Sequence, residues 1–219
     1  MRRFPRWKAL AAAMSLGAAL LFSPPAEATV AVPVDRAQQV GLSDLIVRAT
    51  VTARSSMWNA DHSQIVTLTR LRVTAWVKGA GTSELVLRQL GGTVGDTVMQ
   101  VSGDAHFTVG QDAVLFLRRG DGVVFLTAMA QSAYYVQGRA DGTPMVHRDL
   151  HGLTFARMRD GQMQFSEPGD EAPETLRHLL DELNVIVQRP RVDTSDVSVI
   201  GSPASAAPVA TPPVLRSGR

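Results

Sequence analysis

The side chains best suited to chemistry gather between His147 and His151. His147-Arg148-Asp149-Leu150 matches the His-Arg-Asp-Leu of protein-kinase catalytic loops, but the chain has neither the glycine loop nor the Asp-Phe-Gly that kinases need. His147, Asp149 and His151 are also metal-ligand types. A four-residue spacing brings ligands together on a helix, whereas this segment is predicted to be extended or turned. We therefore expect structural or solvent-facing histidines, no resident metal ion and no cofactor.

Patterns for a nucleophile and for phosphate binding are incomplete. Ser43 follows Gly41 but lacks the second glycine of a nucleophile elbow, and it suits a cap or turn before a strand. The glycine-rich stretch from Gly91 to Gly110 contains no lysine of a phosphate-binding loop. The 219 residues include no cysteine, which excludes disulfides, thiolate metal sites and a cysteine nucleophile. Together these patterns indicate a protein that is not an enzyme.

Trp58 is the aromatic residue best placed to contact a partner. It lies in the polar stretch 55–63, which we expect to be a loop, and exposed aromatic side chains often anchor interfaces. Trp76, Phe116 and Phe125 lie in apolar segments and are predicted to belong to the core.

The first 28 residues have the pattern of a secretory signal peptide. Four basic residues precede an apolar run from Ala9 to Phe22, which is shorter than the roughly 20 residues needed to cross a bilayer. Ala26-Glu27-Ala28 fits a signal-peptidase site, so we expect cleavage after Ala28 and a mature chain that begins at Thr29. An uncleaved membrane anchor is the alternative. The sequence thus predicts a secreted or periplasmic protein with no stable membrane span after cleavage.

Removing the signal peptide changes the charge of the chain. The formal charge of the whole sequence is +2, and the signal peptide holds four of the 22 basic residues and one of the 20 acidic ones, which leaves the mature chain at −1. Without a basic run, nucleic-acid binding loses its usual electrostatic support. Residues 191–219 are rich in Ser, Pro, Ala and Val, which predicts a disordered tail. Residues 29–190 remain as one domain.

Alternating apolar and polar residues dominate this domain. Period two is clear in residues 45–53 and again in 65–77, a long stretch that suggests coiling or a bulge. Residues 113–117 are apolar on both faces, as in a strand that is covered on both sides. Further short strands are expected at residues 84–90, 123–127, 134–136, 145–147, 153–158 and 163–165.

One helix is predicted near the end of the domain. Pro173 suits its first turn, Glu171 and Glu174 suit its positive end, and Pro190 ends it. Its apolar stripe is expected to dock on the strands and comprises Leu176, Leu179, Leu180, Leu183, Ile186 and Val187. Many short strands and a single helix predict a mainly β protein, either a small β-barrel or a sandwich, with one packed helix.

Three short motifs carry a resemblance to a known family. Thr29-Val30-Ala31-Val32-Pro33 is followed ten residues later by Ser43-Asp44-Leu45-Ile46-Val47-Arg48-Ala49, and Val77-Lys78-Gly79 ends the long second strand. This order resembles the start of a netrin-like domain and is most similar to tissue inhibitors of metalloproteinases. It is also similar to uncharacterised secreted bacterial proteins. Ala113 to Leu117 matches a later apolar strand, so the resemblance spans about residues 29–127.

The resemblance implies a small closed OB-like β-barrel and a binding site at the mature N-terminus. In the inhibitor family, the first residue's α-amine and carbonyl chelate the protease's zinc, and the second side chain fills the specificity pocket. Thr29 would then chelate, Val30 would fill the pocket, and Ala31 to Pro33 would form the wedge. The family pins this wedge by disulfides at the positions of Thr29 and Ala31, so here the segment would have to be ordered on binding.

We therefore predict a secreted, non-catalytic binding module that resembles a metalloprotease inhibitor. Its expected partner is an extracellular or periplasmic protein such as a zinc metalloprotease. The alternative is an oligosaccharide-binding or hydrolytic envelope protein that uses the barrel face. The predicted partner-binding residues are Thr29, Val30, Ala31, Val32, Pro33 and Trp58.

Overall fold

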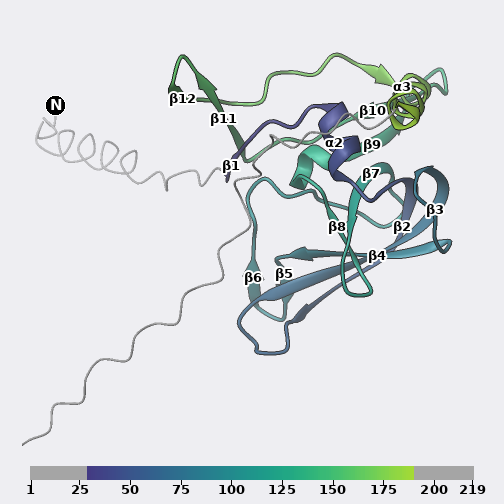
Figure 1. Cartoon of the computed structure of the whole chain (residues 1–219). Helices are drawn as coiled ribbons and strands as arrows, with labels where there is room; N and C mark the ends of the chain where they lie inside the picture. The colour runs from purple at the N-terminus through teal and green to yellow at the C-terminus, as the bar shows by residue number, and fades with distance from the viewer. Residues whose placement is uncertain (1–28, 190–219) are drawn as a thin grey trace, which may run out of the picture. The chain divides into compact units, whose positions relative to one another are not determined.

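The computed structural model describes residues 29–189, and the predicted signal peptide and tail lie outside them (Figure 1). In chain order, its elements are β1 (Thr29–Ala31), α2 (Arg36–Leu42), β2 (Leu45–Trp58), β3 (Ile65–Lys78), β4 (Glu84–Leu90), β5 (Gly92–Val94), β6 (Thr97–Met99), β7 (Asp112–Arg119), β8 (Val124–Leu126), the short 3-10 helix η2 (Met129–Ser132), β9 (Ala133–Gly138), β10 (Pro144–His147), β11 (Leu153–Arg159), β12 (Gln162–Ser166), β13 (Glu174–Thr175) and α3 (Leu176–Gln188).

Five strands close into a barrel. β2 pairs with β3, β3 with β4, β4 with β8 and β8 with β7, and β7 returns to pair with β2. Numbered along the chain, the barrel strands follow the order 1-2-3-5-4-1, and the third and fifth are parallel while the other pairs are antiparallel. The long strand β2 has three register shifts against β3, and such bulges let a strand bend around a small barrel. This confirms the predicted small closed OB-like β-barrel.

The strand β7 lies between two hydrophobic clusters, as its two-sided apolar pattern predicts. Ala113, Leu115 and Leu117 face the barrel interior. Val114 and Phe116 face outward and pack against a second cluster formed with α3. Burial of both faces makes β7 the wall that separates the barrel core from the helix.

The helix α3 docks on this wall through its predicted stripe. Leu179 and Leu183 are fully buried, Leu176 is nearly so, and the other members of the stripe are partly buried against the same cluster. The helix starts later than the sequence predicts, because Glu174 and Thr175 first pair with β10 as β13. Thr175 then caps the helix by accepting a hydrogen bond from the His178 backbone N–H.

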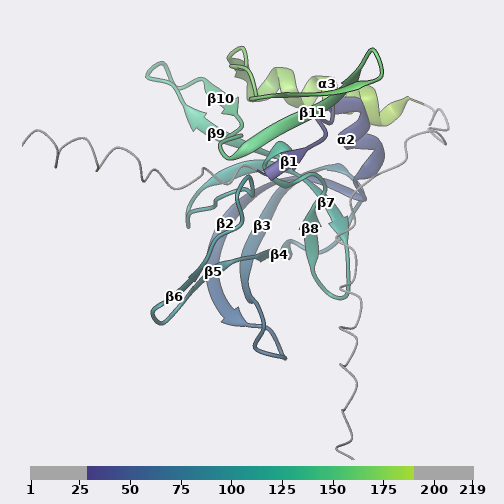
Figure 2. The same ribbon diagram turned by 90° about the vertical axis from the view of Figure 1, so that its left-hand side faces the viewer.

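A separate three-stranded sheet has the order β1-β11-β12, and its first pair is parallel. Figures 1 and 2 both show this sheet, together with α2 and α3, above the barrel. Leu153 and Phe155 of β11 reach down into the barrel core. The sheet is therefore anchored at its base, while the β11–β12 hairpin projects from it.

A short helix, α2, was not predicted. Asp35 caps it by accepting a hydrogen bond from the Gln38 backbone N–H, and the Gln38 side chain bonds back to the Asp35 N–H in a capping box. Its C-terminal end is held by Lys78, whose Nζ donates to the carbonyls of Val40 and Ser43 at 2.6 Å each. The Ser43-Asp44-Leu45 and Val77-Lys78-Gly79 motifs therefore contact each other, and their role in this chain is structural.

Two predictions about aromatic residues were wrong. The stretch 55–63 is not a loop throughout, because β2 continues to Trp58 and pairs there with Ile65, and only the following residues form the turn. Phe125 is 37% exposed rather than buried, and its ring lies over Gly120 on the outside of the barrel. Phe116 is fully buried as expected, and Trp76 is partly buried against the core.

Candidate functional site

The N-terminal segment Thr29 to Pro33 is tied to the body of the protein. Its first three residues form β1 and pair with Leu153, Thr154 and Phe155. The Thr29 backbone N–H donates to the Gly152 carbonyl at 2.9 Å, and the Thr29 Oγ1 donates to the Ser102 carbonyl at 2.6 Å. The backbone of β1 is thus fixed by pairing rather than by disulfides.

A second tie comes from Gln131 in η2, which is almost fully buried. Its Nε2 donates to the Val32 carbonyl at 3.2 Å, and its Oε1 accepts from the Val34 backbone N–H at 2.9 Å. One amide therefore holds the chain on both sides of Pro33. Sequence reasoning missed this residue, because nothing in the local pattern pairs a glutamine with a segment about a hundred residues earlier.

The fixed backbone sets the direction of each side chain in the predicted wedge. Ala31 packs against the barrel core. Val30 and Val32 remain 57% and 62% exposed, while Thr29 and Pro33 are half-buried. The two valines are therefore the parts of this segment that another molecule can reach.

Val30 adjoins an apolar surface that the sequence did not single out. Val30 pairs with Thr154, and side chains directly opposite each other share one face of a sheet. The register of β11 with β12 places the following exposed side chains on that same face. We call this set the outer face: Val30 (57% exposed), Met158 (66%), Met163 (58%) and Phe165 (59%).

The outer face could not be recognised from alternation alone. Met163 and Phe165 alternate with glutamines, a pattern that also fits a strand with its apolar side in the core. The structure places every residue of β12 in an exposed position. Clustered exposed apolar side chains of this kind mark interaction surfaces.

Trp58, the other predicted contact residue, lies apart from this region at the far end of β2. Its ring stacks on His62 with 6.2 Å between ring centroids, and it is partly buried. Residues 59–64 form the turn that follows, with the Asn59 side chain accepting from the backbone N–H groups of Ser63 and Gln64. The structure does not bring Trp58 together with the N-terminal segment.

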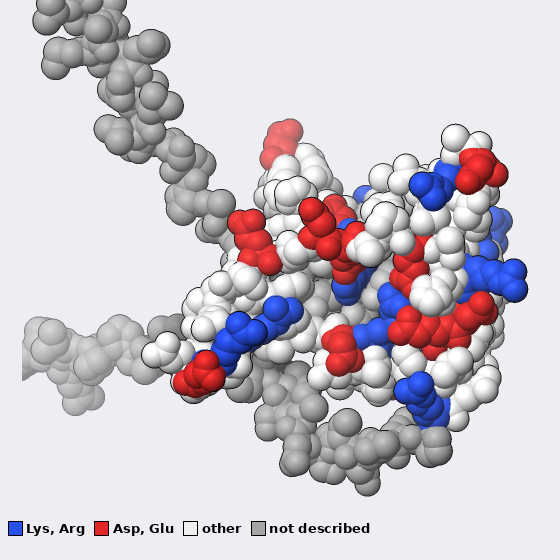
Figure 3. All heavy atoms as spheres, turned by 90° about the horizontal axis from the view of Figure 1, so that it is seen from above, with Lys and Arg blue, Asp and Glu red and all other residues white. Residues whose placement is uncertain are grey.

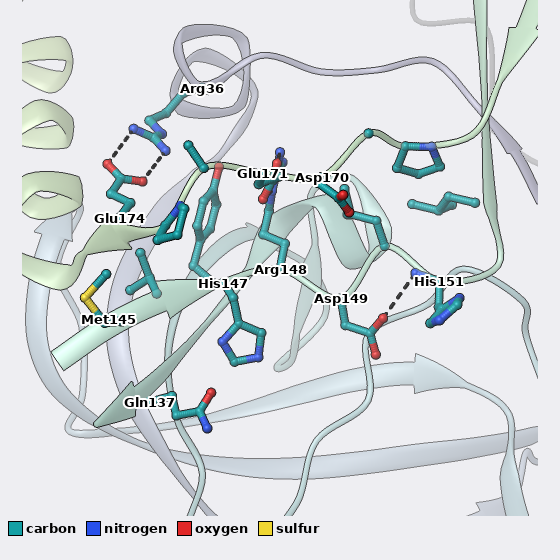
Figure 4. Close-up of a pocket in the computed structure, with 18 of the residues that line it drawn as sticks. Arg36, Gln137, Met145, His147, Arg148, Asp149, His151, Asp170, Glu171 and Glu174 are labelled. Atoms are coloured by element: carbon teal, nitrogen blue, oxygen red, sulfur yellow. Dashed lines mark hydrogen bonds and ion pairs between the residues drawn. The ribbon is translucent and has the colours of Figure 1, made fainter. Parts of the chain in front are cut away.

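A groove of about 1390 Å³ lies between β10 and the segment 167–175 (Figure 4). His147, Asp149 and His151 line it, but they do not converge, and Asp149 instead accepts a hydrogen bond from the His151 backbone N–H at 3.1 Å. Arg148 reaches back to Glu171, with its Nε 2.9 Å from a carboxylate oxygen. This ion pair holds the segment 167–175 over the groove.

Tyr134 lines the groove, and its ring is covered by two arginines. The guanidinium carbons of Arg36 and Arg148 lie 5.5 and 5.1 Å from the centre of its ring. Aromatic rings that bind sugars present an open face, whereas this ring is engaged by cations. The Tyr134 ring is therefore not open for stacking on a sugar. This groove lies outside the five barrel strands, so it does not bear on the oligosaccharide-binding alternative, which uses the barrel face.

Within residues 29–189, one histidine–carboxylate group is compact enough to share an ion: Glu174, His178 and Glu182, whose ligand atoms lie within 4.8 Å of one another. Arg36 already pairs with both glutamates, with its Nη2 2.8 Å from Glu174 Oε2. Burial alone would lower the pKa of Arg36, but its bonds to Glu174 raise that pKa above the ordinary value. Both carboxylates of the cluster thus already share a permanent cation, and we assign the cluster a structural role.

A smaller hollow of about 220 Å³ lies on the barrel beside the β5–β6 hairpin. Asp104 and Gln89 line it, and burial raises the pKa of the Asp104 carboxyl above its ordinary value. Its Oδ1 accepts from the Ala105 backbone N–H at 2.8 Å, so the carboxyl has a local structural bond.

Surface charge gives no single-sign patch on the face that carries α3 and the hairpin. Figure 3 shows acidic and basic side chains next to each other there. This mixture does not favour a polyanion as the ligand of this face. Among the helices of residues 29–189, none is both long and apolar enough to cross a membrane.

No protein-family model matches this chain, and no curated protein sequence matches it. We therefore infer the function from the geometry of the molecule.

Replacing Gln131 by alanine is expected to free the N-terminal segment. Because the Val34 N–H and the Val32 carbonyl lose their partner, we expect the free energy of unfolding to fall by about 1–2 kcal/mol. We also expect the Val34 amide to exchange hydrogen much faster than in the unchanged protein. Gln137→Ala, at an exposed position on β9, is the control and should change neither quantity. Unchanged protection of Val34 in Gln131→Ala would show that the segment is held without Gln131.

Proposed function

We propose that this chain is an exported, non-catalytic binding protein that contacts a partner protein through its N-terminal segment and the adjoining outer face. The observation that carries the proposal is the fixed position of Val30 and Val32. Their side chains are more than half exposed, while the backbone of this segment pairs with β11 and is hydrogen-bonded to the Gln131 side chain.

Fixing the backbone before binding removes a cost that a free terminus would carry. Ordering a residue costs about 1–2 kcal/mol of backbone entropy, so a five-residue segment that must be ordered would lose much of its binding energy. In this chain the sheet pairing and Gln131 do what disulfides do in the inhibitor family. A preorganised apolar segment next to further apolar side chains is suited to a protein interface.

The netrin-like relationship belongs to this proposal as well. It is supported by the 1-2-3-5-4-1 strand order and by the contact between Lys78 and the Ser43 carbonyl, which joins two of the motifs that carry the resemblance. A more specific version of the proposal, which we call the narrower form, names a zinc metalloprotease as the partner. For chelation, cleavage after Ala28 must turn the Thr29 nitrogen, which donates to the Gly152 carbonyl, into a free α-amine whose lone pair can bind zinc.

Export is the first part of the proposal to test. N-terminal sequencing of the protein from the periplasmic and extracellular fractions should give a chain that starts at Thr29. A chain that starts at Met1 and stays with the membranes would contradict cleavage and would favour the anchored alternative.

Binding is tested with the double variant Val30→Asp/Val32→Asp of the mature chain. The partner is captured from the producer's own exported proteins and its affinity for each variant is measured by calorimetry. Because the variant places two charges in an apolar contact, we expect the affinity to fall at least about 100-fold. The matched control is Val98→Asp/Val109→Asp, which changes two valines that are at least as exposed and lie in other parts of the chain, and it should bind as the unchanged protein does.

The outcomes separate the possible partners. Inhibition of a panel of zinc metalloproteases by a chain that starts at Thr29, and its loss when one residue is added before Thr29, would support the narrower form. Equal binding by the double variant and its control would contradict the proposal. Turnover of a glycoside or ester library by the purified protein would favour the hydrolytic alternative.

A further inference from the structure

The hairpin β11–β12 ends the three-stranded sheet with an open edge. Among residues 29–189, β12 pairs with β11 alone, and all five of its residues are exposed. Its sequence, Gln-Met-Gln-Phe-Ser, contains no charge and no proline. Proteins commonly block exposed edge strands with charged residues or proline, and an edge without them can accept another strand.

The turn of the hairpin determines which backbone groups face this edge. Asp160 and Gly161 have φ angles of 53° and 74°, as in the type I′ turn of a two-residue hairpin loop, and Arg159 pairs with Gln162 across it. In such a hairpin the residues that flank the turn form a hydrogen-bonding pair, and pairs then alternate along the ladder. Counted from Gln162, the N–H and C=O groups of Met163 and Phe165 therefore face the open edge.

We propose that a second copy of this chain pairs with β12, antiparallel and centred on Gln164. Met163 then lies opposite Phe165 of the second copy, and Phe165 opposite Met163 of the second copy. These are the two residues whose backbone groups face the edge, and a two-fold axis through Gln164 exchanges them. The edge is thus complementary to itself, which is the requirement for a closed symmetric dimer.

Charge supports the antiparallel direction of this pairing. The tip of the hairpin carries Arg157 and Arg159 beside Asp160, whereas the chain after its base carries Glu167 and Asp170, and all of these side chains are exposed. An antiparallel arrangement places the mainly basic tip of one copy beside the acidic base of the other. A parallel arrangement would place like charges together.

The dimer extends the outer face. A two-fold axis perpendicular to the sheet gives six strands in the order β1-β11-β12-β12-β11-β1 and keeps Val30, Met158, Met163 and Phe165 of both copies on one side. The inference does not depend on the proposed function, because self-association uses the backbone edge of β12, whereas the partner contact is tested at Val30 and Val32, at and just after β1 on the opposite edge of the sheet. The Val30→Asp/Val32→Asp variant should therefore still dimerise, which makes the failure of one proposal distinguishable from the failure of the other.

The test compares two double variants of the mature chain by sedimentation velocity over a dilution series from high micromolar to nanomolar. Met163→Lys/Phe165→Lys places lysine opposite lysine at both cross-strand pairs. Met163→Lys/Phe165→Glu removes the same apolar side chains but places lysine opposite glutamate. We expect the unchanged chain to dimerise, and the Lys/Glu variant to dimerise at least about tenfold more tightly than the Lys/Lys variant.

Two controls keep the comparison specific. Met163→Glu/Phe165→Lys reverses the charges and should dimerise as the Lys/Glu variant does. Added salt should reduce the difference in dimerisation constant between the Lys/Glu and Lys/Lys variants. Far-UV circular dichroism and equal Tm values verify that each hairpin is folded. An unchanged chain that is monomeric throughout the series would overturn the inference. Equal dimerisation constants for the Lys/Lys and Lys/Glu variants would also overturn the inference. They would mean that the chains associate through another surface or through non-specific hydrophobic contact.

Discussion

Leu179→Ala is expected to lower the free energy of unfolding by about 3 kcal/mol. We also expect the C-terminal end of the domain to unfold less cooperatively with the rest. Leu179 is fully buried where α3 meets the outward side of β7, in the cluster that contains Phe116 and Val114. The expected loss is the sum of the hydrophobic free energy that the removed leucine atoms contributed and the cost of the cavity left in a well-packed wall. Chemical denaturation, followed by far-UV circular dichroism, measures it.

The matched control is Val185→Ala on the exposed side of the same helix. It removes apolar atoms of a similar kind without opening a cavity, so its effect should stay within about 0.5 kcal/mol. If the two variants lose equal stability, α3 is not docked on β7 as described.

Gly79→Ala is expected to cost about 2–3 kcal/mol, the second largest effect. Gly79 has a φ of +77°, a conformation that costs a residue with a Cβ roughly 1–2 kcal/mol. A Cβ at this position would also lie 2.6 Å from a Leu45 methyl carbon and 3.0 Å from the Asp44 carbonyl oxygen, so β3 and the start of β2 would have to separate. The free energy of unfolding from urea titration provides the measurement.

Gly142→Ala separates the two causes of this loss. Gly142 has a similar φ of +81° but no atom within 4 Å of the added Cβ. It should therefore lose only the conformational part, roughly 1 kcal/mol, and the remainder in Gly79→Ala measures the close contact of the two motifs. Equal losses would mean that Leu45 moves aside without cost.

Much of the barrel follows from period-two alternation, because its strands have one face in the core. The same rule fails where neither face is buried. The second half of β2 is exposed on both sides, so its pattern carries no hydrophobic signal, and pairing with β3 alone extends the strand to Trp58. This is why a loop was expected from Ser55 onward.

The helix α2 was missed for a related reason. Of its seven residues only Val40 and Gln39 are buried, which is too little apolar surface for a helical periodicity. Its one local signal is the capping box of Asp35 and Gln38. The late start of α3 depends on tertiary pairing of Glu174 with β10, which local sequence does not encode.

The site was predictable only in part. The residues Thr29 to Pro33 were named from a resemblance, and the structure adds which of them are accessible and what holds them. The outer face depends on the register between β1, β11 and β12, and Gln131 depends on a contact between distant parts of the chain. Strand register and contacts between distant residues exist only in the folded chain, so local sequence patterns do not predict them.

The ties of the N-terminal segment are hydrogen bonds and sheet pairing, and the chain has no thiol. The segment's geometry is therefore independent of redox potential. Glutathione, dithiothreitol or a missing oxidase should leave the fold unaltered, so the molecule can be produced in a reducing cytosol with its N-terminal strand intact. A scaffold of this kind also tolerates reductants that would unfold a disulfide-braced counterpart.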